Sequence, residues 1–397
     1  MKIVQINTTC GVGSTGKICV GISELLTRDN IENYIFYSEK SNGYDLGIGF
    51  ADRKYIKFQA LKSRVFGNYG FNSKKETEKM IAELDRIEPD IVHLHNIHGH
   101  DCDLEVLFTY FKKKRTKLIW TFHDCWAFTA YCPHFAMIKC DNWKDGCRNC
   151  PQKRCYTWFF DRSKFLYDKK KKLFSGLDLT IVTPSEWLSD LVKQSFLQDY
   201  PIKVINNGID LTVFSPVSND FRDKYQIPEN KKIILGVAFG WGVRKGLDVF
   251  LDLEKRLDHD HYQIVLVGTD DKVDRQLPQN IISIHRTNNQ TELAEIYTAA
   301  DLFVNPTREE NFPTVNIESL ACGTPVLTFN TGGSPEILDS SCGSVVDCDD
   351  IAALEKEIVC SFAKKMFSGQ TCLKRAEGFD KNKKFQEYIA LYGGVVQ

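Results

Sequence analysis

Residues 301–334 read DLFVNPTREENFPTVNIESLACGTPVLTFNTGGS, and this stretch decides the fold. Its apolar runs predict strands at 302–304 and 326–329, joined by a loop and a short helix that stops near Gly323. Two carboxylates, Glu310 in the loop and Glu318 on the helix, accompany this unit. Parallel α/β sheets bind ligands beyond the carboxyl ends of their strands, so the stretch predicts a binding site.

The chemistry of this predicted site suits a nucleotide-sugar. The loop residues Phe312, Pro313 and Thr314 place a helix N-terminus between the two carboxylates, and free backbone N–H groups there bind phosphate. Carboxylates on either side can accept hydrogen bonds from sugar hydroxyls. The pattern therefore indicates a site for a sugar joined to a diphosphate.

Strands and helices alternate along the whole chain, which predicts parallel, doubly wound sheets. The pattern starts twice, each time with a strand followed by a glycine-rich loop, at residues 11–16 and 240–246. We therefore expect an α/β protein with two Rossmann-like domains facing a central cleft. The first spans residues 1–199 and contains a cysteine-rich insertion at 125–155. The second spans 200–377, and a final helix at 378–397 packs back on the first.

The first loop, Gly11-Val12-Gly13-Ser14-Thr15-Gly16, matches the dinucleotide fingerprint GxGxxG between a strand and a helix. It also fits the spacing of a phosphate loop, but Ile18 stands where that loop needs a magnesium-binding hydroxyl. The glycines let backbone N–H groups approach a diphosphate or sugar, so Gly13, Ser14 and Gly16 are candidate donor contacts.

The second loop carries cations at the start of a predicted helix. Arg244 and Lys245 stand directly before Gly246 and Leu247. The helix dipole disfavours positive charge at this end, so their position indicates function rather than helix stabilisation. A fixed cation here would stabilise the negative charge that develops on a departing diphosphate.

Histidines end two strands of the first half. His123 follows the strand at 117–122, and Asp124 beside it could orient the imidazole. His95 ends the strand at 90–95 and Asn96 follows it; both are candidates for the acceptor side of the cleft. Alternation along the strand also puts His93 and His95 on one face, which leaves a metal cluster open as an alternative.

The insertion contains six of the fourteen cysteines. Cys132, Cys140, Cys147 and Cys150 have a spacing that could hold a structural zinc ion with four thiolate ligands. The alternative is a set of free thiols in an insertion ordered by its own aromatic residues, such as Trp126 and Trp143. Both interpretations stay open.

Composition and charge place the chain among ordinary cytoplasmic proteins. It has 397 residues with 43% hydrophobic and 26% charged side chains, no apolar run long enough for a membrane helix, and a first strand in place of a signal peptide. Residues 1–200 contain 30 Lys and Arg against 24 Asp and Glu, which favours an anionic partner. The basic runs at 112–115 and 169–172 are either solvated helix ends or patches for the anionic inner-membrane surface.

These motifs together resemble the retaining glycosyltransferases of the GT-B fold, family 4. The Glu310/Glu318 pair, the segments VTPSEWL and VINNGID, and Trp120-Thr121-Phe122-His123-Asp124 with its cysteine insertion carry the resemblance. Within the family it is most similar to bacterial capsule, exopolysaccharide and colanic-acid-type enzymes. One departure is Gly240, which stands where the family has an arginine; Arg244 could replace that arginine.

The resemblance implies transfer of a sugar from a UDP- or GDP-sugar to a saccharide or polyprenyl-linked acceptor, with retention at the anomeric carbon. Glu310 and His123 would contact the donor sugar, Glu318 the ribose, and Lys245 with Arg244 the diphosphate. No cofactor or metal is expected for catalysis, and no nucleic acid as partner. The enzyme would work in the cytoplasm or at the cytoplasmic face of the inner membrane.

Two other enzyme classes remain open from the sequence. A nucleotide-sugar epimerase would share the fold and the donor but need no acceptor. A dehydrogenase would bind NAD at the loop of residues 11–16.

Overall fold

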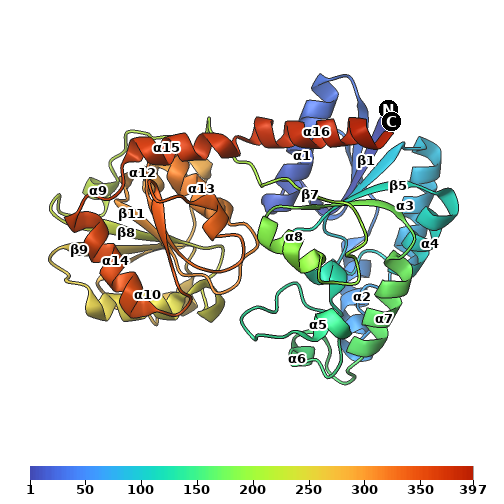
Figure 1. Ribbon diagram of the computed structural model, residues 1–397, viewed down its shortest axis with the longest axis horizontal. Coiled ribbons are helices and arrows are strands. Elements are labelled where there is room, and N and C mark those ends of the chain that lie inside the picture. The colour runs from blue at the N-terminus through green and yellow to red at the C-terminus, as the bar shows by residue number, and fades with distance from the viewer. Residues whose placement is uncertain (397) are drawn as a thin grey trace. The chain divides into compact units, whose positions relative to one another are not determined.

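The computed structural model describes residues 1–396 and divides into two compact units, each built on one parallel β-sheet (Figure 1). The first unit consists of Met1–Asn206 together with the chain from Lys384 onward, and the second of Asn207–Lys383. Both sheets are doubly wound, as the alternation of strands and helices predicts.

The sheet of the first unit has seven strands in the order β3-β2-β1-β4-β5-β6-β7, all parallel. Its strands are β1 (Lys2–Cys10), β2 (Glu32–Ser41), β3 (Gly47–Gly49), β4 (Ile91–Leu94), β5 (Lys117–Thr121), β6 (Asp178–Thr183) and β7 (Ile202–Val204). The central strands are buried on both faces because helices cover both sides of the sheet, as parallel sheets require.

Helices α1 (Gly13–Arg28) and α16 (Lys381–Val396) pack on one face of this sheet, against Ile3, Ile91 and Ile119. The other face carries the larger core, and its main helices are α3 (Lys74–Ile87), α4 (Leu104–Lys114), α7 (Ser163–Phe174) and α8 (Glu186–Val192). The remaining helices of this unit are α2 (Arg53–Phe66), η1 (Trp126–Phe128), α5 (Asn142–Asp145) and α6 (Lys153–Tyr156).

The sheet of the second unit has six parallel strands in the order β10-β9-β8-β11-β12-β13. These are β8 (Lys232–Val237), β9 (Tyr262–Val267), β10 (Ile281–Ile284), β11 (Leu302–Asn305), β12 (Val326–Phe329) and β13 (Gly343–Val346). Helices α12 (Gln290–Ala299), α13 (Thr314–Ala321) and α15 (Gly369–Ala376) cover one face, and α10 (Leu247–Arg256) and α14 (Ile351–Ala363) cover the other. The shorter helices are α9 (Phe221–Lys224), η2 (Val243–Lys245), α11 (Asp271–Asp274), η3 (Pro335–Ile337) and η4 (Glu377–Phe379).

Each sheet has one point where the strand order reverses. In the first unit it lies between β1 and β4, and in the second between β8 and β11. Ligands of open α/β sheets bind outside the carboxyl ends of the strands at such points. The glycine-rich loops follow β1 and β8, His95 and Asn96 follow β4, and Glu310 lies in the loop after β11.

Two boundaries differ from the sequence expectation. The chain divides after Asn206 rather than after residue 199, because β7 pairs in parallel with β6 and belongs to the first sheet. Helix α1 begins at Gly13, so the second half of the predicted glycine-rich turn already forms the first helical turn. Between residues 40 and 75, where the family resemblance is loosest, the chain forms α2.

Candidate active site

The loop between β8 and α10 holds the two predicted cations. Lys245 ends the short helix η2, and Gly246 follows it with φ 77°, a left-handed conformation that starts α10. A Cβ atom on Gly246 would lie 2.5 Å from the carbonyl oxygen of Pro306. Only glycine fits there, and the close approach brings the Lys245 loop against the segment after β11.

The loop after β11 carries the first carboxylate. Residue 332 must be glycine, because its φ is 56° and a Cβ atom would lie 1.5 Å from the carbonyl oxygen of Glu310. The amide of Gly333 donates to the carbonyl of Asn311 at 3.0 Å. The Gly332-Gly333 turn therefore supports the backbone on which Glu310 is presented, a role that the sequence reading did not assign to it.

The structure brings Lys245 and Glu310 together. The Lys245 ammonium lies 2.5 Å from Oε2 of Glu310, and both side chains are about one-fifth exposed, at 22% and 21%. A charged pair that is mostly but not fully covered keeps its geometry while staying open to a ligand. Such a pair offers one cation for a phosphate and one carboxylate for sugar hydroxyls.

Arg308 holds these two loops together, and the sequence reading missed it. Its guanidinium makes a two-pronged ion pair with Asp248 on α10, at 2.8 and 2.7 Å, and its Nε donates to Asp349 at 2.6 Å. It also donates to the carbonyl oxygen of Val243 in η2. Fork-shaped pairs of this kind are geometrically specific, so Arg308 is a positioning residue for Lys245. Its pKa is raised above the ordinary arginine value, first by the hydrogen bond with Asp248.

Helix α13 supplies the second carboxylate and the predicted phosphate-binding end. Pro313 occupies the N-cap without a side-chain cap, so backbone N–H groups of the first turn are not satisfied by a capping side chain. Glu318 lies further along the same helix and accepts a hydrogen bond from the hydroxyl of buried Tyr297 at 3.3 Å. Burial, together with the charge of Glu318, raises the pKa of Tyr297 well above its usual value. Phe312 is buried in the core below, which anchors the loop.

Arg244 differs from its neighbour. Its side chain is exposed and makes no ion pair with any described residue, while its carbonyl oxygen accepts from the amide of Arg308 at 2.9 Å. The guanidinium is therefore available at the edge of the loop, and its assignment to the diphosphate stays a prediction.

In the first unit, Gly11 and Gly13 adopt left-handed φ values of 68° and 70°, and α1 starts at Gly13. A Cβ atom on Gly16 would lie 2.7 Å from Oγ1 of Thr9, so this helical position also needs glycine. Gly13 and Ser14 are exposed at the helix start. The loop thus presents a helix N-terminus, which suits a phosphate or a polar sugar group.

A chain of hydrogen bonds leads to His123 and decides which of its nitrogens carries a proton. Gln5 donates through Nε2 to the carbonyl of Cys19, so its Oε1 accepts from Nε2 of His95 at 3.2 Å. A neutral His95 is then an acceptor at Nδ1, where Nε2 of His123 lies 3.1 Å away and donates. This network assigns the proton of His123 to Nε2 and makes Nδ1 its acceptor atom.

Burial keeps these imidazoles neutral. Burial, assisted by the charge of His123, lowers the pKa of His93 to about 3. Burial also lowers the pKa of His123 to about 4, although the charge of Asp124 acts in the opposite direction. The pKa of His95 is also held well below its usual value by burial. His123 can therefore serve as a hydrogen-bonding group at neutral pH rather than as an acid.

Asp124 has two further partners in the structure. Its Oδ2 pairs with Nε2 of His98 at 2.9 Å and its Oδ1 accepts from the amide of Trp126 at 2.8 Å. Burial acts to raise the pKa of Asp124, but the charge and hydrogen bond of His98 outweigh it and lower that pKa. His95 contacts His123 directly, at 3.1 Å between their ring nitrogens. Asn96 follows His95 in this part of the first unit, and its backbone amide donates to Oδ1 of Asn7.

The predicted cysteine cluster gathers at one edge of the first core. Cys132 and Cys147 are buried members of that core, and Cys140 and Cys150 pack against it. Within residues 1–396, however, Asp271, Asp274 and His285 form the one group of three or more potential ligand atoms that lie within 4.8 Å of one another. No three of these four sulfur atoms therefore lie within that distance of one another, so they do not form a closed tetrahedral site. The same search does not group His93 with His95 as metal ligands.

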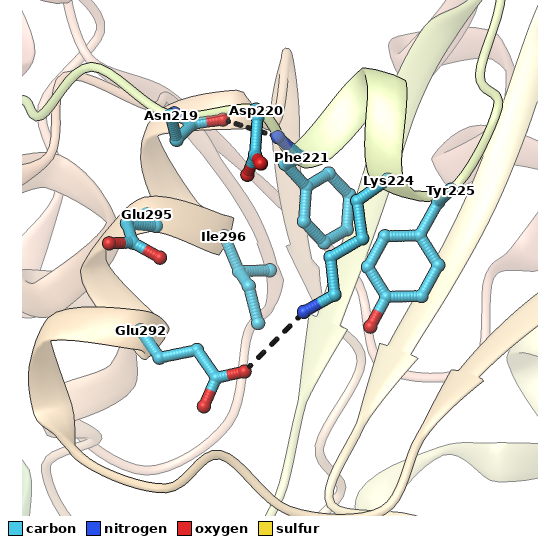
Figure 2. A pocket seen from close by; sticks show the side chains of 8 residues that line it. All are labelled: Asn219, Asp220, Phe221, Lys224, Tyr225, Glu292, Glu295 and Ile296. Carbon is cyan, nitrogen blue, oxygen red and sulfur yellow. Dashed lines mark hydrogen bonds and ion pairs between the residues drawn. The ribbon is translucent and has the colours of Figure 1, made fainter.

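A separate pocket lies in the second unit between α9 and α12 (Figure 2). Lys224 reaches across it toward Glu292, with 3.8 Å between ammonium and carboxylate. None of the predicted donor residues lines this pocket, so it is not part of the candidate active site. No helix in the described part of the chain is long and apolar enough to cross a membrane.

Comparison with known proteins identifies the family. Residues 20–213 match the model of Glycosyltransferase Family 4, and residues 217–361 match that of Glycosyl transferases group 1. A protein of Escherichia coli (strain K12) named as a colanic acid biosynthesis glycosyl transferase, WcaC, is 21% identical over 99% of both chains.

Solved structures share the fold over the whole chain. Sucrose-phosphate synthase from Thermosynechococcus elongatus has a TM-score of 0.73 at 18% identity and covers 100% of this chain and 99% of its own. Anabaena Alr3699/HepE, solved in complex with UDP-glucose, has a TM-score of 0.70 at 13% identity, with 99% and 100% covered. These likenesses confirm the predicted GT-B fold. The chain is therefore a glycosyltransferase of the GT-B fold and belongs to glycosyltransferase family 4.

Proposed function

We propose that this glycosyltransferase moves a sugar from a UDP- or GDP-sugar to a saccharide acceptor carried on a polyprenyl lipid, in the synthesis of a bacterial surface polysaccharide. The observation that carries the proposal is the Lys245–Glu310 pair at the strand-order reversal of the second sheet, next to the N-terminus of α13. Cation, carboxylate and helix N-terminus together match the parts of a sugar diphosphate.

Each candidate residue has a role that its geometry suits. Lys245, with Arg244 beside it, would neutralise the diphosphate, and Glu310 would bind the donor sugar. Glu318, half-buried on α13 and held by Tyr297, would accept hydrogen bonds from the ribose hydroxyls.

Nδ1 of His123 would accept a hydrogen bond from a hydroxyl of the donor sugar, because its Nε2 is engaged by His95. Gly13, Ser14 and Gly16 would contact the donor through backbone groups.

The proposed reaction retains the configuration at the anomeric carbon. The acceptor hydroxyl oxygen bonds to that carbon on the face from which the diphosphate leaves, and the bond between the carbon and the phosphate oxygen breaks. The acceptor proton passes to the departing phosphate oxygen, which leaves as the nucleoside diphosphate. The positive charge of Lys245 stabilises the negative charge that develops on this leaving group. No protein nucleophile and no metal-binding Asp-x-Asp pair are needed for this route.

The relatives support the donor and the pathway. HepE has been solved with UDP-glucose, and the name of WcaC places that protein in colanic acid biosynthesis. Asn96 and the surroundings of Asp124 remain candidates for the acceptor side. His95 would act there through His123, because it is buried and Gln5 and His123 engage both of its ring nitrogens. An epimerase or an NAD enzyme is disfavoured because both halves of the chain match glycosyltransferase models.

The donor is tested by measuring the melting temperature of the purified protein with UDP, GDP, ADP, CMP and NAD. A ligand that binds only the folded state raises stability, so we expect one of UDP or GDP to raise the melting temperature. Lys245→Ala should remove that shift, whereas Lys255→Ala, which removes an exposed lysine of α10, should leave it intact. A shift with NAD alone would overturn the proposal.

Transfer and stereochemistry are tested with the matching nucleotide-sugar and a polyprenyl-linked saccharide. The product should form only with acceptor present, and its anomeric proton coupling should match that of the donor. Turnover of the donor sugar into an isomer without acceptor would identify an epimerase instead.

A further inference from the structure

The first unit exposes an unusual set of large apolar side chains. Among the described residues, fifteen large hydrophobic side chains are exposed, and seven of them lie on α2 and in the segment 158–165. These seven, which we call the aromatic patch, are Phe58, Leu61, Phe66, Trp158, Phe159, Phe160 and Phe165, with exposed fractions between 46% and 64%. Single exposed apolar residues are normal, but a contiguous group marks an interaction surface.

Contacts between backbones join the two segments into one surface. The amide of Trp158 donates to the carbonyl of Arg64 at 2.7 Å, which ties the three consecutive aromatic residues to the end of α2. A Cβ atom on Gly67 would lie 3.2 Å from the carbonyl oxygen of Phe160, so these backbones touch. The Arg162 guanidinium lies 4.4 Å above the ring of Phe165 and connects the patch to α7.

Helix α2 is built for this exposure. It buries only Ile56, Gln59 and Ser63, which lie along one side of the helix, while Phe58 and Leu61 are exposed on the other side. A helix with an apolar surface flanked by cations and with low mean hydropathy is typical of the membrane interface. Figure 1 shows α2 in the same part of the first unit as α7, the helix that carries Phe165, and Arg162 before α7 contacts Gly67 at the end of α2.

The surroundings of the patch are strongly basic. Helix α2 contains five lysine and arginine residues and no acidic residue, and the segment 153–164 adds four cations against Asp161 alone. Within the described chain, Lys164 is the one of these nine that forms an ion pair, with Asp168. The patch therefore presents aromatic rings inside a field of uncompensated positive charge, which calls for an anionic partner.

The lysine run at 169–172 does not form one continuous exposed cationic surface. Lys170 is fully buried, and its ammonium donates to the carbonyl oxygens of Trp126 and Thr129 at 2.8 and 3.1 Å. Lys169 pairs with Glu105 at 2.7 Å. The buried Lys170 therefore fits neither of the two interpretations that the sequence left open for this run, a solvated helix end or a membrane patch.

We propose that the aromatic patch docks this enzyme on an anionic lipid bilayer, with Trp158, Phe159 and Phe160 inserted at the level of the lipid headgroups. Tryptophan and phenylalanine prefer this interface, and each nearby lysine or arginine adds attraction to anionic lipid. A second copy of the chain is a poorer occupant, because a symmetric dimer would bring two strongly basic surfaces together. The inference deepens the proposed function, since a lipid-linked acceptor is presented at such a surface.

The test is co-sedimentation of the full chain with vesicles, without donor or acceptor. We compare vesicles of phosphatidylcholine with vesicles of phosphatidylcholine and phosphatidylglycerol in equal amounts. We expect binding to the anionic vesicles, weakened by salt, and at least about tenfold weaker partitioning for W158S/F159S/F160S. A matched control, V345T/V359S/M366S, replaces three exposed apolar residues of the second unit and should bind as the native chain does.

Insertion is distinguished from adsorption by tryptophan fluorescence. Of the six tryptophans, Trp158 is 55% exposed, Trp187 and Trp241 are partly buried, and Trp120, Trp126 and Trp143 are at most 2% exposed. Because Trp158 is the one that lies in the aromatic patch, brominated lipids should quench chiefly Trp158. The variant W158F should bind vesicles and lose most of that quenching. Circular dichroism and thermal melting confirm that each variant is folded.

Several results would overturn the proposal. One is native-like vesicle binding by the triple serine variant, and another is the absence of binding to anionic vesicles. A third is concentration-dependent dimerisation that the same variant abolishes, and a fourth is displacement from vesicles by single-stranded oligonucleotide. Because this assay uses no nucleotide-sugar, its failure would leave the donor experiment above unaffected, and failure of the donor experiment would not explain a loss of vesicle binding.

Discussion

At the scale of single residues, the candidate site depends on one contact, the ion pair of Lys245 with Glu310. Lys245 comes from the loop after β8 and Glu310 from the loop after β11, 65 residues further along the chain. The sequence could nominate both, because a cation at a helix start and a carboxylate after an apolar strand are visible as patterns. It could not pair them, because pairing follows from β8 and β11 being neighbours in the sheet.

Removing either charge should abolish most of the activity. Lys245→Ala and Glu310→Gln should each lower kcat/KM by about a hundredfold or more, since each removes a polar group aimed at developing charge or at the sugar. The measurement is release of nucleoside diphosphate under single-turnover and steady-state conditions. Lys255→Ala provides the control, and native-like turnover of either site variant would remove that residue from the site.

Arg308 should act through position rather than through contact with the donor. Arg308→Lys keeps a positive charge but loses the two-pronged pair with Asp248, so the Lys245 loop becomes less well positioned. We expect the KM for the donor to rise about tenfold, with a smaller fall in kcat, because the loop can still reach the active geometry. The matched control is Arg256→Lys, which changes an exposed arginine of α10, the helix that carries Asp248. A fall in kcat alone would indicate direct participation in chemistry instead.

At the scale of elements, the sequence predicts regular strands and helices well and irregular segments poorly. The central strands of both sheets could be located because buried parallel strands read as short apolar runs between turn residues, as at 302–304. The strands β3, β10 and β13 were not predicted. Helix α2 was not predicted; it buries only three of its residues, so most of its apolar side chains do not mark a core-facing side. Segments that are held by partners from elsewhere in the chain, such as the loop of Arg308, cannot be recognised from their own local sequence.

The sequence left open what holds the cysteine insertion in its folded conformation. Two interpretations survive, because its aromatic residues stack, as Phe135 and Trp143 do, while its four cysteines also gather at one core edge. We expect about one zinc ion per purified chain where the four thiolates bind metal, and none where they are free thiols. Elemental analysis by mass spectrometry measures the zinc content.

Substitution identifies the ligands of that ion. C140S/C150S should lose the zinc and lower the melting temperature, whereas Cys360→Ser in the second unit should change neither. Zinc below about a tenth of an ion per chain, with native stability after chelator treatment, would establish the cysteines as free thiols ordered by aromatic packing.

At the scale of the whole molecule, the repeated pattern of strands and helices was sufficient to predict two doubly wound units. What it could not give is how the chain returns to its first unit. The last helix does so through specific polar contacts, because Nδ1 of His93 lies 2.7 Å from the hydroxyl of Tyr392 and Thr121 donates to Tyr388. These buried partners are 299 and 267 positions apart in the sequence, so only the fold brings them together.

The buried histidines of the first unit should make the protein less stable in mild acid. Burial holds the pKa of His93 at about 3 and that of His123 at about 4, whereas an unfolded chain titrates near 6.5. Between those values the unfolded chain binds protons that the folded chain excludes, so the free energy of unfolding rises with pH. The slope should approach about 1.4 kcal/mol per pH unit for each such histidine. His98 opposes this in part, because Asp124 outweighs its burial and raises its pKa.

Urea unfolding followed by circular dichroism at a series of pH values from about 7.5 to about 5 measures this slope. His93→Gln can keep hydrogen bonds to Tyr392 and Thr121 but cannot be protonated, so its stability should fall less steeply as the pH is lowered. His261→Gln, which replaces a histidine whose side chain is 70% exposed, should leave the slope unchanged. A native protein that gains stability on acidification through this window would show that the network around His93, His95 and His123 is charged in the folded state, and the acceptor role of Nδ1 in His123 would fall with it.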